Sequence, residues 1–205
     1  MANFADAIEP ILDLGGAISF PMRWLPEEAS QTAVEGTPVQ INGTDGGIQA
    51  WDGTTVTRGI AGFAAMNFAN LGSLGAGQAQ PFSPVLGPGS VIGNYAANSN
   101  QPLAVITPPM TPLSDGTLGF YVAAPTTIFI AKLGTSATVT PVATAQNQAG
   151  TLAGLTKDTG NNFWYVDTNK TNAVLIVGFD PREAIGTVGG HVWFVVLNSV
   201  AQIFQ

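Results

Sequence analysis

The stretch GIQAWDGTTVTRGIAGFAA, residues 47–65, decides the fold class. The pair Asp52-Gly53 is typical of a two-residue hairpin turn, because glycine tolerates the positive φ that such turns require. Residues before and after this pair read as β-strands. A turn at this position places the side chains of Trp51 and Val56 on one face of the strand pair. The sequence therefore predicts a β-hairpin in which Trp51, Asp52 and Gly53 have a structural role.

The same β texture continues on both sides of the hairpin. The segment TPVQI at 37–41 alternates, and Asn42-Gly43 after it is another hairpin-type turn pair. Further strand-like segments lie at 119–133, 137–143, 163–166, 173–179 and 191–204. The prediction is an all-β protein with a small β-barrel or β-sandwich body and an extended N-terminal arm, and with a second β unit as an open alternative.

Four segments are expected along the chain. Residues 1–33 contain apolar residues at helix-like spacing, but Pro10, Pro21 and Pro26 interrupt them, so we expect an extended or partly helical arm outside the core. Residues 34–70 form a β segment, and residues 71–118 form a Gly/Pro-rich loop or inserted region. Residues 119–205 are β-rich and either complete the barrel or form a second one.

Composition excludes several function classes. Lys and Arg number 6 against 13 Asp and Glu, so the net charge is −7, and only 9% of residues are charged, against about 25% in ordinary soluble domains. Such a chain cannot neutralise a run of phosphates, which argues against nucleic-acid and anionic-membrane partners. The chain has no Cys. Its first 14 residues hold no Lys or Arg, so we expect no secretory signal. The uncharged surface favours contacts with neighbours in an assembly.

Candidate chemistry is sparse. His191 is the single histidine and opens a strand-like segment, and no Gly-x-Ser-x-Gly motif is present, so an ordinary strand-end role is expected. The aspartates are scattered over predicted turns, where they bond to their own backbone. We therefore predict no catalytic residue, no metal site and no cofactor. Two alternatives stay open, namely a carbohydrate-binding module built on Trp24 and Trp51, and a hydrolase with two carboxylates.

The segments GTPVQI, IQAWDGTT and RGIAGFAA together resemble the head decoration (capsid cement) proteins of tailed bacteriophages, typified by the lambdoid trimeric decoration protein. The resemblance is specific over residues 36–65, and only general over GGHVWFVVLNSVAQIF at 189–204. The chain is roughly twice as long as the compact members of that family, and residues 70–160 match no part of them.

The resemblance implies a viral structural protein, made in the host cytoplasm and assembled on the outer surface of the virion. It implies a homotrimer that binds the major capsid protein of an expanded capsid and cements neighbouring subunits. In that family an N-terminal arm becomes ordered against the shell, and the matching segment here is residues 1–36. The expected capsid-binding anchors are the apolar residues of this arm, Phe4, Ile8, Ile11, Leu12 and Trp24. Another virion protein, from a tail or a vertex, is the nearest alternative.

Overall fold

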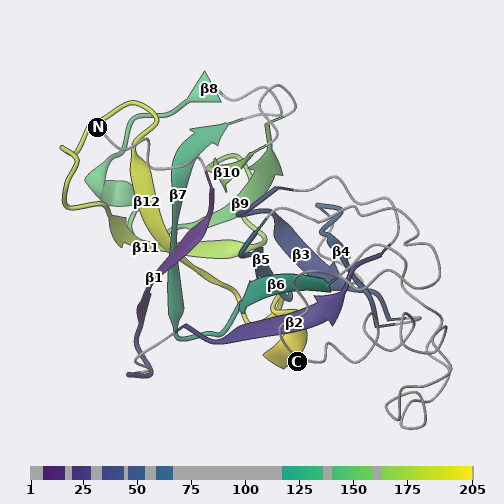
Figure 1. Cartoon of the computed structure of the whole chain (residues 1–205). Helices are drawn as coiled ribbons and strands as arrows, with labels where there is room; N and C mark the ends of the chain where they lie inside the picture. Colours follow the sequence, from purple (N-terminus) through teal and green to yellow (C-terminus); the bar gives the residue numbers. More distant parts are fainter. Residues whose placement is uncertain are drawn as a thin grey trace, which may run out of the picture.

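The computed structural model describes residues 7–16, 20–28, 34–43, 46–53, 59–66, 117–135, 140–158 and 163–204. Within these ranges the protein is all-β, with twelve strands and two short 3-10 helices (Figure 1). The strands are β1 (Glu9–Asp13), β2 (Met22–Pro26), β3 (Pro38–Ile41), β4 (Ile48–Ala50), β5 (Gly62–Ala64), β6 (Thr117–Val122), β7 (Thr127–Thr135), β8 (Thr140–Pro141), β9 (Leu152–Lys157), β10 (Trp164–Asp167), β11 (Val174–Phe179) and β12 (His191–Val196). The 3-10 helices are η2 (Gln146–Gln148) and η3 (Gln202–Phe204).

Five strands close into a barrel. The order is β7-β10-β9-β11-β12, and β12 pairs again with β7. The β7–β10 pair is parallel and the other four pairs are antiparallel. Alternate residues of each barrel strand face the core, as Phe129, Ala131 and Leu133 do in β7. Ile128 and Ile130 between them are buried as well, so β7 is covered on both faces. β1 and β8 pair with β7 outside the closed ring.

The second sheet has the order β2-β6-β5-β3-β4, with antiparallel pairs throughout. A bridge between Glu27 and Ile48 brings its two ends together, and the Glu28 N–H donates to the Ile48 carbonyl at 2.9 Å. Its own small core contains Val39, Ile48, Ala61, Ala64, Leu118, Phe120 and Val122. The two sheets lie side by side and the chain passes from β6 directly into β7 (Figure 1).

Aromatic side chains join the two sheets into one core. Phe63 of β5 lies 4.5 Å from Phe129 of β7 and 5.9 Å from Phe194 of β12, measured between ring centroids. All three rings are fully buried. Trp51, which follows β4, lies 5.7 Å from Trp164 of β10. The sheets therefore share a hydrophobic core and are not independent bodies.

The structure corrects the prediction of a free N-terminal arm. β1 pairs with β7, β2 pairs with β6, and Ile8 is only 1% exposed, within the shared core. The prolines mislead because an edge strand tolerates them: the β1–β7 register shifts between Pro10 and Leu12, as at a β-bulge. The remainder of the predicted arm, residues 1–6, 17–19 and 29–33, lies outside the described residues.

The structure also corrects the hairpin turn predicted at Asn42-Gly43. β3 and β4 do form a hairpin, with Val39 opposite Ala50. However, the Asn42 N–H donates to the Gly47 carbonyl at 2.7 Å, so the connection is longer than the predicted pair Asn42-Gly43. Gly46, with φ +78°, supplies the left-handed residue.

Other segments behave differently from their prediction. β6, at the start of the predicted C-terminal part, belongs to the five-stranded sheet, and β7, β9, β10, β11 and β12 build the barrel. β9 was not predicted. Residues 67–116, which include most of the predicted Gly/Pro-rich loop, lie outside the described residues.

Candidate functional site

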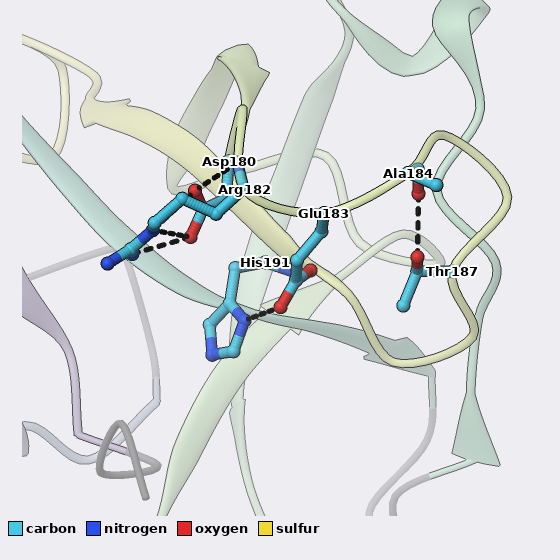
Figure 2. A network of polar contacts seen from close by, with 6 residues as sticks. All are labelled: Asp180, Arg182, Glu183, Ala184, Thr187 and His191. Atoms are coloured by element: carbon cyan, nitrogen blue, oxygen red, sulfur yellow. Dashed lines mark hydrogen bonds and ion pairs between the residues drawn. The ribbon is translucent and has the colours of Figure 1, made fainter. Parts of the chain in front are cut away.

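A polar network holds the loop between β11 and β12 (Figure 2). Asp180 follows β11 and is only 4% exposed. Its carboxylate accepts hydrogen bonds from the Arg182 guanidinium at 2.8 and 2.6 Å, and from the Arg182 backbone N–H at 2.9 Å. These hydrogen bonds lower the pKa of Asp180 from its ordinary value, although burial acts in the opposite direction. Asp180 is thus a turn aspartate, as predicted, with an additional ion pair.

The same loop is closed at its other end by Glu183 and His191. One carboxylate oxygen of Glu183 lies 2.7 Å from His191 Nδ1, and the other accepts the His191 backbone N–H at 2.7 Å. In this contact the imidazole donates when the proton is on Nδ1. His191 is the first residue of β12, in agreement with the predicted strand-end position. No local sequence pattern predicts its pairing, since Glu183 lies eight residues away in an irregular loop.

These side chains line a pocket of about 230 Å3 together with Ala7, Glu9 and Ile130. The pocket therefore lies where β1, β7 and the loop before β12 meet. Ligand atoms of Asp180, Glu183 and His191 lie within 4.8 Å of one another, a spacing that suits a divalent cation. However, Arg182 already binds the Asp180 carboxylate, and His191 already binds both oxygens of Glu183. A metal ion would have to displace these partners. The Asp180–Arg182 and Glu183–His191 pairs instead hold the loop in place, and together they form the clamp on loop 180–190.

A second polar cluster lies on β9 and β10. Tyr165 is opposite Thr156, whose hydroxyl donates to Asp167 Oδ2 at 2.7 Å. Burial first, and then the charges of Asp167 and Asp158, raise the pKa of Tyr165 to about 12, and the nearby Thr156 hydroxyl offsets a small part of this rise. The Tyr165 phenol is therefore neutral at physiological pH, and its hydroxyl has no hydrogen-bond partner among the described residues.

The predicted capsid-binding anchors do not form one surface. Ile8 is buried in the protein's own core and is not available to a partner. Ile11 is half-buried in β1, and Trp24 is half-buried in β2 with its ring over Gly119. Leu12 is 45% exposed, and Phe4 lies outside the described residues.

An exposed residue that was not predicted lies next to Leu12. Leu14 is 67% exposed and follows β1, an edge strand of its sheet among the described residues. Edge strands offer unpaired backbone groups to a partner. The exposed apolar part of this segment is therefore the edge of β1 with Leu12 and Leu14.

The predicted hairpin residues Trp51, Asp52 and Gly53 occupy positions that fit a structural role. Trp51 is 3% exposed within the shared core, Asp52 is exposed, and Gly53 has φ +82° as a turn glycine requires. The strand-like run predicted after them covers residues 54–65. Residues 54–58 lie outside the described residues, and Gly62–Ala64 form β5, which pairs with β3 and β6 and not with β4. The burial of Trp51 contradicts the alternative of a sugar platform built on Trp24 and Trp51, because a stacking ring must be open to solvent.

No protein-family model matches the chain, and no curated protein or solved structure shows significant similarity to it. Among the described residues, no helix is long and apolar enough to cross a membrane.

Proposed function

We propose that this protein is a structural component of a bacteriophage virion that binds the outer surface of the expanded capsid and cements neighbouring major capsid protein subunits. It acts without a catalytic site or cofactor, as an oligomer for which the sequence resemblance implies three copies. A tail or vertex component is the nearest alternative, and differs in copy number and partner.

The observation that carries the proposal is the exposed apolar edge of β1. Leu12 and Leu14 are 45% and 67% exposed on a chain in which only 9% of residues are charged. An edge strand with apolar side chains can add to the sheet of a partner, where backbone hydrogen bonds supply affinity. This surface replaces the free arm of the sequence prediction, because Ile8 and β2 are committed to the fold.

Multivalency supports the same role. Several copies held together place several β1 edges on one patch of a regular lattice, so modest single contacts add through high effective concentration. Burial of each leucine contributes about 1.5–3 kcal/mol before ordering costs are subtracted.

Co-sedimentation of the purified protein with expanded, undecorated capsids tests the proposal. The double variant Leu12→Asp/Leu14→Asp is expected to lose binding by at least about tenfold, since two charges would be buried without partners. Met66→Asp, a matched control at 37% exposure outside β1, is expected to bind like the wild type. Saturation of capsids by the double variant would contradict the assignment of the β1 edge, and failure of the wild type to bind would contradict the decoration role.

A further inference from the structure

The peptide bond between Asp180 and Pro181 is the only Asp-Pro bond in the chain. It lies directly after β11, at the start of loop 180–190. An aspartate carboxylate can attack the main-chain carbonyl carbon of its own residue, because nucleophile and target are already held close together in one small ring. Proline has no N–H, so this amide is tertiary, and its nitrogen takes up a proton more readily than that of a secondary amide. The bond is therefore intrinsically open to attack from within its own residue.

The turn at residues 180–183 polarises the carbonyl group of this bond. The Glu183 N–H donates a hydrogen bond to the Asp180 carbonyl oxygen at 3.1 Å. Negative charge develops on that oxygen when the carbonyl carbon is attacked, and a fixed backbone N–H stabilises such a charge. Asp180 also lines the pocket of about 230 Å3 described above, which has room for water. The fold thus supplies a nucleophile, a polarised carbonyl and access for water at one bond.

The side chain of Arg182 restrains the nucleophile (Figure 2). Asp180 Oδ1 accepts hydrogen bonds from the Arg182 backbone N–H at 2.9 Å and from Nε at 2.8 Å. Asp180 Oδ2 accepts from Nε at 3.0 Å and from Nη2 at 2.6 Å. Both oxygens are engaged, so each must give up hydrogen bonds before it can attack. The same hydrogen bonds lower the pKa of Asp180, since they stabilise the carboxylate form.

We propose that Asp180–Pro181 is a self-cleavage site of this chain, and that the Arg182 side chain keeps the bond intact in the folded protein. One carboxylate oxygen of Asp180 forms a bond to the Asp180 carbonyl carbon. The bond from that carbon to the Pro181 nitrogen breaks, and the nitrogen takes up a proton from the solvent. A water molecule then opens the cyclic anhydride and leaves both carboxyl groups of Asp180 free. The overall change is hydrolysis of one peptide bond, without oxidation or reduction.

Cleavage at this bond would separate β11 from β12 in the chain but not in space. β12 stays paired with β11 and with β7. The side chain of Gln202 also accepts from the Ile41 N–H at 2.7 Å and donates to the Ile41 carbonyl at 2.8 Å. The fragments 1–180 and 181–205 are therefore expected to remain associated. The reaction is a single event within the chain and uses no residue of the β1 edge, so it is independent of the proposed function.

Acid is expected to accelerate the cleavage, because the Pro181 nitrogen must take up a proton as it leaves. The charged and titratable groups that line the pocket with Asp180 are Arg182 and Glu183 of the same loop, His191 at the start of β12 and Glu9 of β1. Among these, Arg182 is the group that holds both oxygens of Asp180. Removal of its side chain is therefore the most direct way to release the carboxylate.

Intact-mass spectrometry of the full chain, held for days at pH 3.8, the ordinary pKa of aspartate, tests the proposal through the appearance of fragments 1–180 and 181–205. Arg182→Gln is expected to cleave at least about tenfold faster than the wild type, since hydrogen bonds to a charged group no longer restrain the carboxylate. Arg23→Gln removes an exposed arginine from β2 and is the matched control, which should cleave at the wild-type rate. Pro181→Ala should lose the cleavage.

The same incubation in urea separates the restraint from the turn. Unfolding removes both the Arg182 contacts and the Glu183 donor, so the unfolded wild type and Arg182→Gln should share one rate, above that of the folded wild type and below that of folded Arg182→Gln. Folded Arg182→Gln that cleaves no faster than the folded wild type would overturn the restraint. If it cleaves no faster than the unfolded chain, the role of the turn is overturned, and absence of both fragments from every sample overturns the site.

Circular dichroism checks that each variant is folded before the urea-free incubation. If Arg182→Gln is not folded, the wild type alone decides, because the folded chain must cleave more slowly than the unfolded chain. Equal rates for the two states of the wild type would overturn the restraint.

Discussion

The barrel and the five-stranded sheet are built from the chain in opposite ways. All five barrel strands lie within residues 127–196, whereas the five-stranded sheet takes strands from residues 22–26, 38–64 and 117–122. Pairings across long separations carry a larger loop-closure cost, which must be offset by contacts formed later. The five-stranded sheet therefore depends on its N-terminal strand and on the barrel, while the barrel closes largely through neighbouring segments.

Deletion of residues 1–28 is expected to have the largest effect on the stability of the two sheets, and an unequal one. It removes β1, β2, Ile8 and the buried residue Glu27, and so opens one edge of each sheet. We expect β3–β6 to lose hydrogen-exchange protection, whereas the barrel strands keep a larger share of theirs. Leu14→Ala, at a position 67% exposed, is the control and should leave both patterns unchanged. A truncated protein with wild-type protection in β3–β6 would restore the free-arm interpretation.

Phe129→Ala tests whether the two sheets share one core. Phe129 contacts Phe63 from the five-stranded sheet and Phe194 from the barrel. Truncation of a fully buried phenylalanine is expected to lower the free energy of unfolding by about 3–5 kcal/mol. In chemical denaturation both sheets should lose stability together. Leu152→Ala, at a position 46% exposed, should change it by about 0.5 kcal/mol or less. Separate transitions for the two sheets would contradict a shared core.

Gly36 and Gly46 together test the contact between the N-terminal segment and the five-stranded sheet. Gly36 and Gly46 both have positive φ, +77° and +78°. A Cβ at Gly36 would lie 2.3 Å from the Ile8 backbone nitrogen, whereas a Cβ at Gly46 would have nothing within 4 Å. Both alanine variants incur a backbone cost of about 1–2 kcal/mol, and Gly36→Ala is expected to cost clearly more in thermal unfolding. Equal costs would show that the Ile8 segment moves freely away.

The smallest effect is expected at the clamp on loop 180–190. The Arg182 hydrogen bonds lower the folded-state pKa of Asp180, so their stabilisation is present above the unfolded value of 3.8 and is lost as the pH falls through the lower folded value. Asp180→Asn and Arg182→Gln should both lack this acid-dependent step in urea unfolding followed against pH. The difference should be small, because Arg182 is 55% exposed and solvent screens the pair. Acid profiles of both variants that match the wild type would contradict the role of the pair.

The sequence predicts the class of the fold because alternation and turn chemistry are local. Gly53 has the positive φ that glycine tolerates, and TIFIAKL, rich in β-branched and aromatic residues, lies in strand β7. It does not predict the place of the N-terminal segment. Pro10 interrupts a helix-like apolar pattern and so indicates an arm, and only the three-dimensional register shows that it lies on an edge strand with a bulge.

The residues of the candidate sites likewise divide into those predicted by local sequence and those that depend on tertiary contacts. The turn role of Asp180 is predictable, since aspartate before a proline favours a turn. The Glu183–His191 pair depends on the loop path, and the burial of Trp51 against Trp164 depends on contact between the two sheets. No local pattern reports either contact.

We propose that this protein covers a capsid lattice. Its copy number in purified particles from its source, measured by quantitative mass spectrometry against the most abundant shell protein, tests this proposal. We expect a ratio near one to one. A ratio of a few per cent would place the protein at a tail or vertex, and complete absence from the particles would contradict a virion role altogether.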